Sequence, residues 1–145
     1  MILILKRISE DTIVSDIEAF FDPALKGGWL SRSGRIHQIR IQKLSQPGID
    51  KVEYNALVDV RPDSVAKRAV KQLNRKPVHR KPVNVGFFAE RNLGNDRRIS
   101  RYSKSDDRRK ADRRRQPLQI DDITAQRRVA EIKRSGGSWT TDVTL

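Results

Sequence analysis

One segment, residues 51–90, leaves few folds open to this chain because it alternates between strand and helix patterns. From Val52 to Val60 every second side chain is apolar, which is typical of a strand with one buried face. A helical pattern then begins after Pro62 and ends at Asn74, and a second apolar run extends from Val83 to Ala89. A strand, a helix and a returning strand predict a crossover connection within one sheet.

The preceding residues carry the same kinds of pattern. Residues 2–8 are apolar nearly throughout, which predicts a central strand. Helical spacing then relates four apolar residues, Ile13, Ile17, Phe20 and Phe21, before Asp22-Pro23 ends or weakens the helix. Residues 36–44 alternate as a half-exposed strand, and a turn at 45–48 leads into the next one. The order βαββαβ predicts a ferredoxin-like α+β fold, with a four-stranded antiparallel sheet and two helices on one face.

The second half of this pattern resembles the RNA recognition motif (RRM) family. Leu73-Asn74 stands where that family usually has Leu-Asn-Gly, residues 80–83 stand at the entry to its fourth strand, and Val83, Val85 and Ala89 run along that strand. The resemblance covers residues 1–91 and implies a degenerate RRM-like domain of bacterial type. It also implies RNA as a partner, because RRM domains stack bases on aromatic side chains of the first and third strands.

This sequence departs from the family at those stacking positions. Ile4 occupies the position on the first strand, and Asn55 and Leu57 replace both aromatic residues of the third. Other contacts must therefore compensate if RNA crosses the sheet. On the face without helices, the residues expected to contact nucleic acid are Ile4, Lys6, Arg40, Gln42, Asn55, Leu57, Asn84 and Phe88.

The charge distribution also favours a polyanionic partner. The net charge is +13, and residues 92–115 alone hold 10 Lys/Arg against 4 Asp/Glu. Nucleic acid is favoured over an acidic membrane because no apolar stripe accompanies this basic run. Its arginines offer bidentate contacts to phosphates and planes for stacking on bases, and they are Arg97, Arg98, Arg101, Arg108, Arg109, Arg113, Arg114 and Arg115. A solubilising charge excess is the alternative explanation.

The basic run has almost no apolar residues, so residues 92–116 are expected to be disordered. Residues 117–145 are expected to form a tail in which a short helix over 121–134 folds on a partner. Residues 108–113 also fit the Arg-Arg-x-x-x-Arg signature by which PilZ domains hold a cyclic dinucleotide. The second motif of those domains is missing downstream, and the spacing arises easily in an arginine-rich segment.

Catalysis is not expected. His37 and His79 have no Cys or second His at ligand spacing, and the chain has no cysteine, so neither a metal site nor a cofactor is predicted. No run reaches transmembrane length and the absence of cysteine fits a reducing compartment, so we expect a cytoplasmic protein without a membrane partner. We also expect a monomer. The leading hypothesis is weak single-stranded RNA contact on the sheet, with electrostatic affinity from the arginine-rich segment; duplex DNA stays open. The alternative is a protein-interaction adaptor that uses the same fold without recognising RNA.

Overall fold

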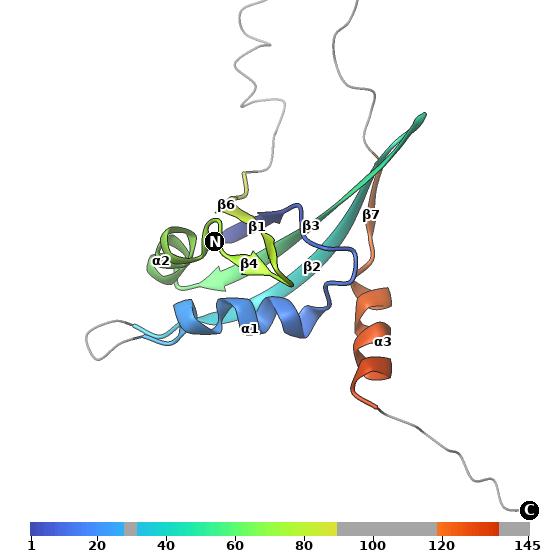
Figure 1. The fold of residues 1–145 in the computed structure, drawn as a ribbon. Helices are drawn as coiled ribbons and strands as arrows, with labels where there is room; N and C mark the ends of the chain where they lie inside the picture. The colour runs from blue at the N-terminus through green and yellow to red at the C-terminus, as the bar shows by residue number, and fades with distance from the viewer. Residues whose placement is uncertain (28–31, 90–118, 137–145) are drawn as a thin grey trace, which may run out of the picture.

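The computed structural model describes residues 1–27, 32–89 and 119–136 (Figure 1). Five strands form an antiparallel sheet in the order β6-β1-β3-β2-β7. The bounds of these strands are Ile2–Lys6 for β1, Arg35–Gln46 for β2, Ile49–Arg61 for β3, Asn84–Phe87 for β6 and Gln119–Asp122 for β7. Two further short strands, β4 (Pro77–Val78) and β5 (Lys81–Pro82), form a separate hairpin.

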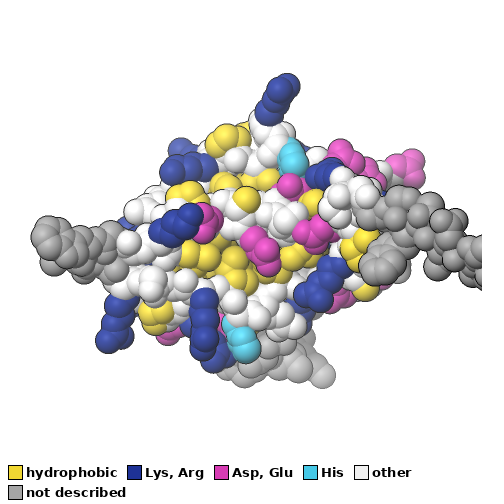
Figure 2. Space-filling view, turned by 90° about the horizontal axis from the view of Figure 1, so that it is seen from below, with side chains coloured by type: hydrophobic (Ala, Val, Ile, Leu, Met, Phe, Trp, Pro, Cys, Tyr) yellow, Lys and Arg dark blue, Asp and Glu magenta, His cyan; other side chains and the backbone are white. Residues whose placement is uncertain are grey.

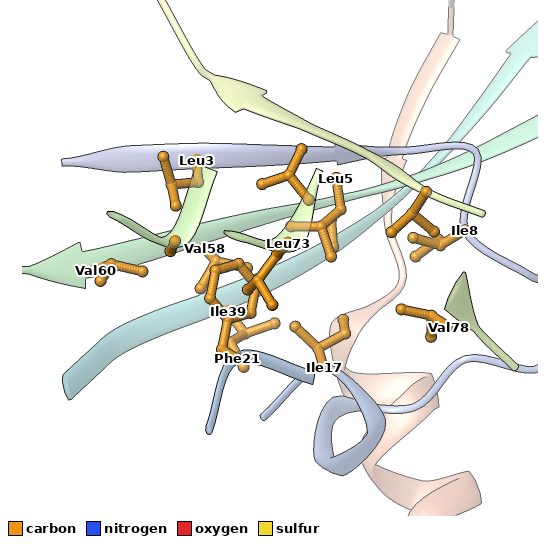
Figure 3. Packing of buried hydrophobic residues seen from close by; sticks show 14 of the residues in the cluster. Leu3, Leu5, Ile8, Ile17, Phe21, Ile39, Val58, Val60, Leu73 and Val78 are labelled. Atoms are coloured by element: carbon orange, nitrogen blue, oxygen red, sulfur yellow. The ribbon is translucent and has the colours of Figure 1, made fainter. Parts of the chain in front are cut away.

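Two helices, α1 (Val14–Leu25) and α2 (Asp63–Leu73), lie on one side of the sheet (Figure 1). Between the sheet and these helices lies the hydrophobic core, to which β1 contributes Leu3 and Leu5 and α1 contributes Ile17 and Phe21 (Figure 3). Every second residue of β3 from Ala56 to Val60 is fully buried on the same side. Burial of these alternating positions explains why the chain pairs in this register, since a slip by one residue would turn the apolar set to the other face.

The predicted βαββαβ order is present, and β1 is an interior strand, between β6 and β3, as expected. Several elements differ in length from the sequence pattern. Helix α1 continues through Pro23 to Leu25, because a proline so close to the helix end removes few hydrogen bonds. Strand β6 is shorter than the predicted 83–89, whereas β2 and β3 are longer and meet at a turn at Pro47-Gly48. Gly48 has φ +79°, a conformation that suits glycine there.

The expected four-stranded sheet with two helices is incomplete. Strand β7 pairs with β2, from Gln42 opposite Asp122 to Ser45 opposite Gln119. A third helix, α3 (Thr124–Arg134), follows directly. Between them Ile123 is only 6% exposed and belongs to the hydrophobic core. The expectation that this helix folds only on a partner is therefore wrong, because α3 packs against α1 and β2 of the same chain. The predicted disorder of residues 92–116 lies outside the described residues.

Specific contacts attach α3 to the sheet. The backbone N–H of Ile123 donates to the carbonyl of Ile41 (2.9 Å), and the N–H of Ile41 donates to the hydroxyl of Thr124 (2.9 Å). That hydroxyl donates in turn to Asp122 (2.5 Å). The guanidinium of Arg127 lies 5.6 Å from the centre of the Tyr54 ring, a cation–π contact. Backbone pairing and charged side chains therefore hold α3, rather than an apolar stripe.

Candidate nucleic-acid interface

The sheet face opposite α1 and α2, called here the outer face, carries the residues that were expected to contact nucleic acid. Since Leu3 and Leu5 point into the core, Ile4 and Lys6 point away from it. Cross-strand register then places side chains of neighbouring strands side by side. Ile4 lies beside Leu57, and Leu57 beside Arg40. An apolar pair next to a cation thus crosses the middle of the outer face.

A second row crosses the outer face one step further along the strands. Lys6 pairs with Asn84 of β6 on one side and with Asn55 of β3 on the other. Asn55 is opposite Gln42, and Gln42 is opposite Asp122 of β7. The structure therefore brings together seven of the eight predicted sheet residues in two adjacent rows. Phe88, the eighth, is half-buried just beyond β6, where its N–H donates to the carbonyl of Ile2 (3.0 Å).

Burial changes what two of these residues can do. Leu57 is 4% exposed and Asn55 is 8% exposed, although the sequence pattern placed both on an accessible face. The side-chain oxygen of Asn55 also accepts a hydrogen bond from the backbone N–H of Arg7 (3.1 Å). This bond holds the turn after β1, where Arg7 adopts φ +62°. Asn55 is therefore a structural residue first, and Leu57 is part of the packed surface.

Sequence reasoning missed the acidic edge of the outer face. Asp122 lies beside Gln42, at the end of the second row. Hydrogen bonds from the hydroxyl and N–H of Thr124 hold the pKa of the Asp122 carboxyl below its ordinary value, and the charge of Arg40 adds to this effect. Nothing in the sequence indicated this acidic edge, because β7 contains a single apolar residue and therefore shows no alternation of apolar and polar side chains. Asp122 offsets part of the positive charge that Lys6 and Arg40 bring.

Asp59 adds a second acidic group to the outer face, in line with Ile2 and Gln38. Burial raises the pKa of its carboxyl, but a hydrogen bond from the Met1 ammonium group (3.1 Å) and the nearby positive charges of Met1 and Arg61 together lower it by more, so the pKa is lowered overall. The carboxylate is thus ionised at neutral pH and engaged with Met1 and Arg61. The outer face carries charges of both signs and offers only modest attraction to phosphates.

The predicted arginines, Arg97 to Arg115, lie outside the described residues. The described residues nevertheless fix where that segment joins the fold. The chain leaves the sheet after β6, at one edge, and returns to it at β7, at the opposite edge. The arginine-rich segment is therefore an internal connection between the two edges of the sheet, and not a free tail.

The side of the molecule that carries α1 has acidic side chains near its middle. In Figure 2, acidic side chains gather near the middle of this side, and Lys and Arg lie around its rim. Helix α1 contains Asp16, Glu18 and Asp22 and no Lys or Arg. A polyanion would be repelled by this helix.

The described part of the chain shows little sign of other chemistry. Within residues 1–27, 32–89 and 119–136, no group of three or more His, Cys, Asp or Glu residues is placed to hold a metal ion. None of the helices in these ranges is long and apolar enough to cross a membrane. His79 lies 2.6 Å from the carboxylate of Asp16 at the start of α1, where it fastens the β4–β5 hairpin to the helix.

Comparisons with known proteins add little to these observations. No protein-family model matches the sequence, and no curated protein matches it either. Among solved structures, the Mip6 RRM3 domain matches with a TM-score of 0.44 and 20% sequence identity, over 59% of this chain and 88% of that one. The description of the fold as ferredoxin-like rests on the strand order and connections given above.

Proposed function

We propose that this protein binds single-stranded RNA, with the outer face positioning the strand and the arginine-rich segment supplying most of the affinity. One observation supports this proposal above the others. The segment with 10 Lys/Arg lies in the connection between the two edge strands of the same sheet. Because both of its ends are fixed there, its cations stay at high effective concentration around any strand that lies on the outer face.

The composition of the outer face indicates what it and the arginine-rich segment would each contribute to binding. Stacking on an aromatic residue contributes about 1–3 kcal/mol per base, and the central positions hold Ile4 and Leu57 instead. Lys6 and Arg40 provide phosphate contacts, while Asp59 and Asp122 oppose them. The outer face therefore contributes register and weak contacts, and phosphate neutralisation elsewhere must provide the affinity.

Salt titrations of three proteins against one labelled single-stranded RNA would test the proposal. In the first variant Arg108, Arg109, Arg113 and Arg114 become glutamine, which keeps β7 and α3 in place. Each phosphate contact on a single strand contributes about 0.7 to the slope of log affinity against log salt, so this slope should fall by roughly 3. In the second variant, Lys6→Gln with Arg40→Gln, it should fall by about 1.4. A wild-type protein that fails to bind RNA at low salt would overturn the proposal.

The adaptor hypothesis remains the second candidate because of one feature of α3. Val129 is 53% exposed and Ile132 is 55% exposed, and α3 has no buried residue. Its apolar side chains point to solvent while polar ones contact the domain, as expected for a helix that docks a protein partner. The same titrations separate the two candidates, since an adaptor without RNA recognition predicts no salt-dependent RNA binding by the wild type.

A further inference from the structure

The β4–β5 hairpin concentrates positive charge. Its residues 75–82 include four cations, Arg75, Lys76, Arg80 and Lys81, and no acidic residue. All four side chains are exposed. No carboxylate in the described ranges forms an ion pair with any of them, whereas His79 is held by Asp16. The hairpin therefore presents unneutralised charge, in contrast to the mixed charges of the outer face.

The hairpin also holds its cations on a backbone with unfavourable positive φ angles. Arg75, His79 and Arg80 have φ values of +66°, +47° and +65°. Two-residue hairpin turns with positive φ at both positions usually contain Asn-Gly, so His79-Arg80 is an unfavourable choice for stability. Val78, which is 5% exposed, anchors the hairpin in the core. Basic side chains thus stand at positions where glycine or asparagine would fit the backbone with less strain.

The hairpin adjoins the outer face. Lys81-Pro82 leads through Val83 into Asn84, which is the register partner of Lys6. Arg7 follows Lys6 and is exposed. Positive side chains therefore continue from Lys6 on the outer face, round the end of β1 and β6, to the hairpin. The neighbouring α1 is acidic, so a polyanion leaving the outer face at this corner is directed toward the hairpin.

We propose that this basic hairpin is a second phosphate-binding surface, which takes up the sugar-phosphate backbone of RNA where the strand leaves the outer face beside Lys6 and Asn84. The proposal rests on the RNA-binding function proposed above and adds a path for the strand. Contact is with phosphates and carries no sequence preference. An RNA too short to extend past the outer face gains nothing from the hairpin, whereas a longer one does.

The test compares two double variants that remove the same charge. The hairpin variant is Arg80→Gln with Lys81→Gln, and the matched control is Lys67→Gln on α2 with Arg128→Gln on α3, both exposed positions. Each is titrated with oligouridines of about four and about twelve nucleotides, since a sheet of this kind addresses two or three bases. For the longer RNA at about 0.1 M salt, loss of two contacts should lower affinity about 25-fold and the salt slope by about 1.4. The control should change affinity less than about threefold.

The outcomes separate this inference from the proposed function. If the wild type does not bind the longer RNA at low salt, both fail. If the wild type binds and the hairpin variant binds equally well, the hairpin inference alone fails. It fails in that case even if the hairpin variant no longer binds phosphatidylserine vesicles, because the hairpin would then contact an acidic membrane rather than RNA. An equal loss in the control, or an equal loss on the shorter RNA, also overturns it. Should the first hairpin variant unfold by circular dichroism, Arg75→Gln with Lys76→Gln provides the same comparison.

Discussion

Gly34 occupies a site where a side chain has no room. A Cβ there would lie 2.6 Å from Cγ1 of Val65 and 3.0 Å from the carbonyl oxygen of Arg61. We expect Gly34→Ala to lower the free energy of unfolding by about 1–3 kcal/mol, because α2 or the end of β3 must shift. Urea denaturation measures this. Gly86→Ala is the control, since a Cβ there meets nothing within 4 Å and should leave stability nearly unchanged.

Asp122 links stability to pH. Its pKa is lowered in the folded state by the hydrogen bonds from Thr124. A lowered pKa means that this carboxylate stabilises the fold above its unfolded pKa and that the contribution is lost as pH falls through the folded pKa. Because Asp122 is exposed and solvent screens its charge, Asp122→Asn should lower the free energy of unfolding by less than about 1 kcal/mol at pH 7. At pH 3 and below, the difference from wild type should shrink; a constant difference from pH 7 to pH 2 would contradict this assignment.

At the scale of elements, the sequence predicted the strands and helices whose apolar residues face the core. Helix α3 shows the limit. The structure contains a helix within the expected range 121–134, yet its apolar residues Ala125, Val129 and Ile132 are exposed, and Arg127 and Arg134 make the contacts. For β7 there was no side-chain signal, because backbone pairing with β2 defines it. On the outer face, alternation predicted which way Asn55 and Leu57 point, but not that their neighbours bury them.

Ile123 tests whether β7 and α3 belong to the core. Ile123→Ala should lower the free energy of unfolding by about 2–4 kcal/mol, because it removes buried methyl groups and leaves a cavity. Ile132→Ala makes the same chemical change on α3 at a side chain that is 55% exposed, and it should cost less than about 1 kcal/mol. Equal effects in the two variants, measured by urea denaturation, would show that β7 and α3 are not docked as described.

At the scale of the whole molecule, charge and stability are carried by different parts of the chain. Helix α1 is acidic, the β4–β5 hairpin is basic, and residues 92–115 hold the largest excess of cations. Removing residues 119–145 should therefore lower stability more than Ile123→Ala does, while the salt slope of RNA binding stays close to that of the wild type. Urea midpoints and salt titrations of the shortened protein measure both quantities. Unchanged stability together with a reduced slope would reverse this assignment of roles.

The late position of β7 in the chain matters during synthesis. The ribosome completes β1, β2, β3 and β6, and then residues 90–118, before it makes the strand that covers Gln42–Ser45 of β2. At about 5–20 residues per second, that interval lasts roughly 1.5–6 seconds. Throughout it, backbone N–H and C=O groups along β2 lack their partner, and such an edge can pair with a strand of another newly made chain. The nascent protein thus exposes a bare edge of β2 until β7 has been made.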